Sequence, residues 1–201
     1  MELKRVVITG MGAITPLGND VATTWDAAKR GVSGAGPITH FDASKFKTQF
    51  ACEVKGFNPD EHFDRRKLRQ LDLYAQYALV AARQAVEDAG LEAEGSDVNK
   101  DRVGVIVAAG IGGLHTFEEE AGYYALNEDK GPKYNPFFIP KMIADIASGH
   151  ISMEYGYHGP NYGVVSACAS SNNAIIDAFN LIRLGKADVM LTGGAEAAIY
   201  P

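Results

Sequence analysis

Cys168 is the residue whose type and position most clearly suggest chemistry. Residues 162–167 are an apolar run typical of a short strand, and residues 170–184 have the pattern of a helix, so Cys168 falls at the bend between them. A sharp strand-to-helix bend of the nucleophile-elbow kind requires small neighbours. The residues around the cysteine are all small: Ser166, Ala167, Ala169, Ser170 and Ser171. The pattern therefore predicts a thiol at a helix N-terminus, where the helix dipole and free amide protons favour the thiolate.

The chemistry that fits this thiol is acyl transfer through a thioester. A thiolate is the strongest nucleophile among the common side chains, and the amides around Cys168 are placed to receive the negative charge of an attacked carbonyl. From the residues alone, a second interpretation stays open, because a cysteine between a buried strand and a buried helix is more often a packing residue. The other cysteine, Cys52, lies in an alternating run between Phe50 and Val54, and we expect it to be such a packing residue.

The elements that must position Cys168 follow an alternating strand and helix pattern. Three apolar runs that each end with glycine predict buried strands: residues 6–10, 103–110 and 188–194. The strongest helical periodicity covers residues 66–89, and further helices are predicted at 23–31, 116–126 and 141–155. Residues 49–54 fit an edge strand, and residues 137–139 are too short an apolar segment for a helix. This order predicts an α/β fold with a largely parallel sheet, which binds ligands at the carboxyl edge of its strands.

Composition excludes several classes of protein. The 201 residues are 46% hydrophobic and carry a formal net charge of −6, which argues against a disordered chain and against a protein that mainly coats nucleic acid. Two cysteines are too few for a disulfide scaffold, and no apolar run is long enough to cross a membrane. The first residues show no secretory signal, so we expect a reducing, cytoplasmic compartment.

No cofactor or metal is expected from the sequence. The glycines after residue 9 resemble part of a dinucleotide-binding fingerprint, but Thr15 stands where the third glycine belongs. His150 and His158 are not accompanied by a set of cysteine or carboxylate ligands, so we expect packing or surface roles for them.

Several segments resemble one family of condensing enzymes, the β-ketoacyl-(acyl carrier protein) synthases, and within it the type II, elongating enzymes. The segments that carry the resemblance are residues 5–18, 110–114, 135–140, 159–161, 167–170 and 188–196. These segments occur in the family's order, and the resemblance extends over essentially the whole chain. The resemblance implies a thiolase-like fold, in which two similar α/β halves form five layers, α-β-α-β-α. Residues 1–201 would form the N-terminal half, which carries the nucleophile.

The resemblance also implies roles for single residues. Cys168 matches the nucleophile that takes an acyl chain from acyl carrier protein and then condenses it with malonyl carrier protein, with loss of carbon dioxide. Ile111 matches a residue that lines the acyl pocket, and Phe138 a pocket residue near a dimer interface. Arg66 and Arg69 are similar in placement to basic residues that dock the acidic carrier protein. The implied partners are acyl carrier protein and a second copy of the chain, with no nucleic acid and no membrane.

The chain departs from the family in its extent. The two histidines and the lysine that the family uses for condensation lie in a second half, which does not occur within these 201 residues. We therefore expect the chain alone to be inactive in condensation and to expose a large apolar face. Two alternatives remain at this point: a non-catalytic half that dimerises and binds the carrier protein, and a relative of the thiolases that use coenzyme A.

Overall fold

The computed structural model describes residues 3–201, and its centre is a parallel sheet of three strands, in the order β4-β3-β5. The strands are β3 (Val103–Ala108), β4 (Asn161–Tyr162) and β5 (Val189–Gly194). The β3–β5 register runs from Val103 opposite Val189 to Ala108 opposite Gly194. All six residues of β3 are buried, as expected for a central strand of a parallel sheet.

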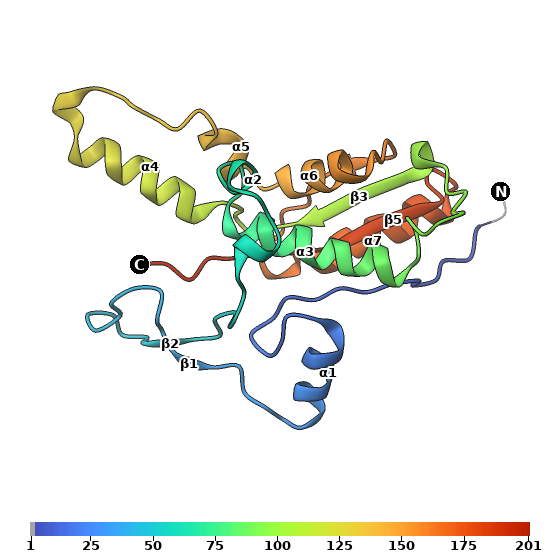
Figure 1. The fold of residues 1–201 in the computed structure, drawn as a ribbon, viewed down its shortest axis with the longest axis horizontal. Helices are drawn as coiled ribbons and strands as arrows, with labels where there is room; N and C mark the ends of the chain where they lie inside the picture. The colour runs from blue at the N-terminus through green and yellow to red at the C-terminus, as the bar shows by residue number, and fades with distance from the viewer. Residues whose placement is uncertain (1–2) are drawn as a thin grey trace.

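Helices cover both faces of this sheet, which confirms the predicted α/β fold (Figure 1). Because side chains alternate along a strand, Val103, Val105 and Val107 face one layer and Ile106 and Ala108 face the other. The first layer contains α3 (Leu73–Asp88) and α6 (Ile146–Tyr155), and the second contains α7 (Ser170–Arg183). The larger core lies on the side of α3, where Tyr74 and Leu79 are fully buried.

The remaining elements are short, apart from two helices. The helices are α1 (Val21–Lys29), α2 (Arg65–Leu68), α4 (Leu114–Leu126) and α5 (Phe138–Met142). A two-residue antiparallel ladder joins β1 (Gly36–Pro37) and β2 (Phe50–Ala51). Only β2 belongs to the edge strand predicted at residues 49–54. Single 3-10 turns are η1 (Pro59–Glu61), η2 (Lys100–Arg102), η3 (Glu128–Lys130) and η4 (Ala167–Ala169). Figure 1 shows α4 projecting away from the sheet as an arm.

The prediction of a strand at residues 6–10 is wrong. This segment has no strand assignment, and Val7 and Ile8 are 57% and 84% exposed. The chain that follows lies along α3, where Met11 N donates to Asp88 and Ala13 N donates to Gln84. Gly10 permits this approach, because a Cβ there would lie 2.3 Å from a carbonyl oxygen of α3. The chain directly after the predicted strand is thus held by a helix rather than by a sheet.

The long helix predicted at residues 66–89 is two helices. The first, α2, ends at Leu68, and Asp72, which is 3% exposed, caps the second, α3, by accepting a hydrogen bond from Tyr74 N. Its other oxygen, Oδ2, accepts from Thr116 N (3.2 Å) and from Thr116 Oγ1 (2.6 Å) in α4. This buried carboxylate accepts from three donors and so satisfies groups in the first turns of two helices, α3 and α4.

Three further elements differ from the predictions. Residues 138–142 form the short helix α5 where none was expected, and Pro140 fits its first turn because that turn needs no backbone donor there. The helix expected at residues 141–155 begins only at Ile146, because Ile143 is extended. The strand expected at 162–167 pairs only at its start, and the chain then turns toward η4.

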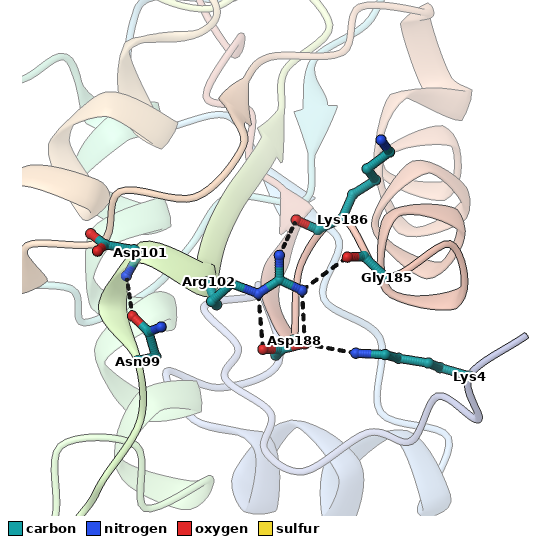
Figure 2. Close-up of polar contacts among 7 residues, drawn as sticks. All are labelled: Lys4, Asn99, Asp101, Arg102, Gly185, Lys186 and Asp188. Atoms are coloured by element: carbon teal, nitrogen blue, oxygen red, sulfur yellow. Dashed lines mark hydrogen bonds and ion pairs between the residues drawn. The ribbon is translucent and has the colours of Figure 1, made fainter.

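An ion-pair cluster joins the start of the two long strands to the end of α7 (Figure 2). Arg102 binds both carboxylate oxygens of Asp188 at 3.0 Å and also donates to the carbonyl of Gly185, just after α7. Lys4 Nζ binds the same carboxylate at 2.9 Å. The hydrogen bonds from Arg102 and then from Lys4 hold the pKa of Asp188 well below its usual range. The cluster thus links the N-terminal segment, the start of the two strands and the end of α7.

No helix within residues 3–201 has both the length and the apolar character that a bilayer span requires.

Candidate active site

Cys168 lies in η4, between Ser166 and the first residue of α7, and its side chain is exposed. The backbone at this junction has an unusual conformation. Ala167 has a φ of +50°, and it is the only non-glycine residue with positive φ among residues 3–201. This conformation costs an alanine on the order of 1 kcal/mol, and such strained residues cluster at functional sites. The core-packing interpretation of Cys168 is wrong, because the residue is not buried.

Short polar side chains brace this turn. Ser170 Oγ donates to the carbonyl of Ala167 (2.7 Å) and accepts from Ser166 N (2.8 Å). Asn173 Nδ2 donates to Ser166 Oγ at 2.7 Å. The sequence indicated only that the residues around Cys168 had to be small. The structure shows that Ser170 and Asn173, which we did not predict as site residues, hold the strained backbone in place.

The amide of Cys168 is available to a ligand. Its two successors are engaged, because Ala169 N donates to the carbonyl of Ser166 and Ser170 N to that of Ala167. Within the part of the chain that the structure describes, Cys168 N has no acceptor. An exposed thiol beside an unengaged amide can attack a carbonyl carbon while the amide stabilises the resulting oxyanion.

The end of β5 packs closely against the start of α7. A Cβ at Gly194 would lie 2.1 Å from Ser171 Oγ, so glycine is required for this approach. The position of α7, and with it the turn that carries Cys168, therefore depends on a strand more than twenty residues later in the sequence.

Ile111 and Phe138 lie on two segments that are joined to each other. Ile111 is in the loop after β3 and is 59% exposed, and Phe138 is the half-buried first residue of α5. A hydrogen bond of 2.9 Å from Gly113 N to the carbonyl of Met142 links this loop to the end of α5. Phe138 stacks on Tyr134 and on Phe117 of α4. The structure thus places the two predicted pocket residues at the base of the α4–α5 arm.

Arg66 and Arg69 are both exposed, on α2 and directly after it. Neither forms an ion pair with any residue that the structure describes. Lys67 differs from them, since its Nζ lies 3.3 Å from Nδ1 of His150. The two predicted docking arginines are therefore free to bind an external anion.

Two cavities lie elsewhere in the molecule, and Cys168 lines neither of them. One, of about 370 Å³, lies between the N-terminal segment, α3 and the residues after β5. Cys52 lines it and is exposed, so the prediction that Cys52 is a packing residue is wrong: β2 ends at Ala51, and the side chain that follows is not covered. The other, of about 420 Å³, is lined by residues of α2, α3 and α6, including His150.

His150 makes the free energy of unfolding depend on pH. It is 6% exposed, and burial, followed by the nearby charge of Lys67, lowers its pKa from 6.5 to about 4. The unfolded chain then binds a proton more readily than the folded chain as the pH falls. We expect full stability above pH 6.5 and a loss on the order of 3 kcal/mol as the pH falls to 4, measured by denaturant unfolding at a series of pH values.

The variant His150→Gln should reduce this acid-dependent loss, because it removes the titrating group. The matched variant His158→Gln alters an exposed imidazole and should retain the loss. Equal pH profiles for wild type and His150→Gln would show that other groups cause the effect.

Among residues 3–201, no three histidine, cysteine, aspartate or glutamate side chains are grouped so as to hold a metal ion.

Comparison with known proteins gives one consistent result. The family model "Beta-ketoacyl synthase, N-terminal domain" matches residues 3–201. A protein named 3-oxoacyl-[acyl-carrier-protein] synthase 2 from Staphylococcus aureus is 47% identical over 197 residues, which are 98% of this chain and 46% of that protein. Its namesake from Synechocystis is 44% identical, over 100% of this chain and 47% of that protein. The chain thus spans about half the length of these relatives.

Solved structures agree with the sequence matches. The ishigamide ketosynthase/chain length factor has a TM-score of 0.86 and 31% identity, over 98% of this chain and 48% of that one. A ketosynthase solved in complex with its type II PKS acyl-carrier protein has a TM-score of 0.81 and 25% identity, over 100% of this chain and 53% of that one. The predicted thiolase-like half-domain is therefore consistent with the structures that this fold matches.

Proposed function

Since the chain belongs to the family of β-ketoacyl synthase N-terminal domains, we propose that it is the nucleophile-bearing half of a β-ketoacyl-(acyl carrier protein) synthase of fatty acid elongation. The observation that carries this proposal is the exposed thiol of Cys168 in a strained, braced turn at the start of α7. The relatives named for this activity and the ketosynthase solved with its carrier protein support it.

In the proposed first step, the thiolate of Cys168 attacks the carbonyl carbon of an acyl thioester. The C–S bond to Cys168 forms, the oxyanion accepts a hydrogen bond from the Cys168 amide, and the C–S bond to the carrier then breaks. The carrier leaves as a thiolate and takes up the proton that Cys168 has lost. This step needs only groups that lie in the turn.

In the proposed second step, malonyl carrier protein loses carbon dioxide, and the resulting carbanion attacks the carbonyl carbon of the acyl thioester. A C–C bond forms, the C–S bond to Cys168 breaks, and Cys168 leaves as the thiolate. The family resemblance implies that the histidines and the lysine for this step belong to a second half. The native protein that contains this half should therefore be the unit that completes the condensation. No resident cofactor takes part in the proposed steps.

The direct test is the intact mass of the native protein after exposure to an acyl thioester. We expect a mass increase of one acyl group, with the label on the peptide that contains Cys168. No label on this peptide would favour the alternative of a non-catalytic half that serves for dimerisation and carrier binding, which the apolar α4–α5 arm also suits.

We further propose that the native protein is a cytoplasmic homodimer that contacts a second copy through the α4–α5 arm. This arm exposes several large apolar side chains, among them Phe117 at 49%, Leu126 at 86% and Ile139 at 54%. Exposed apolar patches of this kind are typical of interfaces.

Reversing the charges of Arg66 and Arg69 to glutamate should slow acyl transfer from acyl carrier protein. Two exposed, unpaired cations steer an acidic partner, so we expect a loss of roughly tenfold or more at low salt, which diminishes as salt is added. The acylation rate with a small thioester of N-acetylcysteamine should be unchanged. Both rates are measured as the appearance of acylated protein by mass spectrometry.

The control for this variant replaces Lys45 and Lys47 by glutamate. These two residues are also exposed cations, and they lie outside α2. This control changes the net charge by the same amount and should have a much smaller effect. Equal slowing by both double variants would mean that overall charge, not a docking site, determines the rate. If coenzyme A thioesters reacted as fast as carrier thioesters, the thiolase alternative would be favoured.

A further inference from the structure

Glu196 binds the loop after β3 through two successive backbone amides. Its Oε2 accepts hydrogen bonds from Gly110 N at 2.6 Å and from Ile111 N at 2.8 Å. Glu196 lies two residues beyond the end of β5, and the hydrogen bond from Ala195 N to the carbonyl of Ala108 brings it beside the end of β3.

The loop that Glu196 holds has little structure of its own. Of its four residues, Gly110 to Gly113, Ile111 alone carries a side chain. Glycine accepts most backbone conformations, so such a loop has no strong intrinsic preference and depends on external contacts. At its far end, Gly113 N is fixed to the carbonyl of Met142. Glu196 is thus the anchor at the near end, and the two anchors together determine where Ile111 points.

The two hydrogen bonds that Glu196 accepts are of a strong kind. A carboxylate that accepts two amide hydrogen bonds forms charge-assisted bonds, which are roughly twice as strong as neutral ones. Glu196 is exposed, so water replaces its carboxylate when the side chain is removed, but water does not fix the two amides, and the peptide between Gly110 and Ile111 can rotate. The side chain of Ile111 would then no longer occupy one position.

We propose that Glu196 is a positioning residue that determines the acyl chain-length selectivity of the thioester-forming site by holding Ile111. This inference rests on the proposed function, because it takes Ile111 as part of the wall that meets the acyl chain. Glu196 itself touches neither the acyl group nor the thiol in this mechanism. Its effect is transmitted through the backbone of the Gly110–Gly113 loop.

The test compares Glu196→Ala and Glu196→Gln with wild type in the native protein. The measured quantity is the ratio of the acylation rates of Cys168 with dodecanoyl and butanoyl thioesters of N-acetylcysteamine. We expect Glu196→Ala to change this ratio by about fivefold or more, and Glu196→Gln by less, because its amide oxygen still accepts hydrogen bonds. Glu94→Ala, at an exposed position in the loop after α3, should leave the ratio unchanged.

A second readout does not depend on activity. Hydrogen exchange at the amides of Gly110 and Ile111 should be faster in Glu196→Ala than in wild type and intermediate in Glu196→Gln. An unchanged rate ratio, or equal slowing with both thioesters, would overturn the inference while acylation of Cys168 kept the proposed function intact. Absence of acylation in the wild type would overturn both. If Glu196→Ala does not fold, a wild-type ratio and wild-type exchange in Glu196→Gln would overturn the inference.

Discussion

Replacing Cys168 by alanine is expected to abolish formation of the acyl-enzyme. The variant removes the only atom that the proposed mechanism uses as a nucleophile, so the rate of acylation should fall below about one-thousandth of the wild-type rate. The neighbouring braces involve Ser166, Ser170 and Asn173 but not the thiol, so the fold of the turn should be retained. The measurement is intact mass against time after addition of an acyl thioester, with circular dichroism as a check on folding.

The chain provides its own control for this experiment. Cys52 is also exposed, so it is open to the same reagent, but it is not at the start of a helix. The variant Cys52→Ala should therefore be acylated at close to the wild-type rate. If Cys52→Ala lost the label and Cys168→Ala kept it, the reactive thiol would have been assigned to the wrong residue.

Replacing Asp72 by alanine is expected to lower the free energy of unfolding by about 3 kcal/mol. Loss of the helix cap costs ~1 kcal/mol, and the buried amide and hydroxyl of Thr116 left without an acceptor cost ~1–3 kcal/mol. The residue is 3% exposed, so water cannot replace the lost carboxylate without rearrangement. The measurement is the denaturant midpoint and slope at neutral pH.

Two variants separate the contributions to this loss. Asp64→Ala removes the cap of α2, which is exposed and has no role in joining helices, so it should cost less than Asp72→Ala. Thr116→Val removes the hydroxyl and retains the amide, so it should cost an intermediate amount. In the double variant the two losses should not add, because both act on one hydrogen-bonded group. A loss at Asp72 no larger than that at Asp64 would contradict this account.

The loss at Asp72 should also loosen the α4–α5 arm. Asp72 joins the start of α3 to the first turn of α4, which follows the Gly110–Gly113 loop directly. Ile111, which is proposed for the acyl pocket, precedes the start of α4, and Phe117 and Leu126, which are proposed for the dimer contact, lie within α4. The core of α3 and the arm are therefore connected through one buried carboxylate.

The local pattern of the sequence was sufficient to predict the elements that are stable through their own burial. The run at 103–108 is apolar at every position, and such a run is compatible with a central strand covered on both faces. The helices predicted at residues 66–89 and 170–184 contain the observed α3 and α7, and the small residues before α7 placed Cys168 at a turn. These features depend on neighbours close in sequence, or only on the presence of a core.

Only the tertiary structure decided the features that depend on partners distant in sequence. Residues 6–10 have the composition of a strand but form none, and the chain directly after them is held by α3, since a strand needs a ladder partner and composition does not specify one. Asp72 joins the start of α3 to α4 because Thr116 is close to it, and Glu196 holds the loop of Ile111 because β5 pairs with β3. Hydrophobic periodicity records which side of an element is buried, whereas a polar contact depends on the position of two atoms that the fold alone brings together.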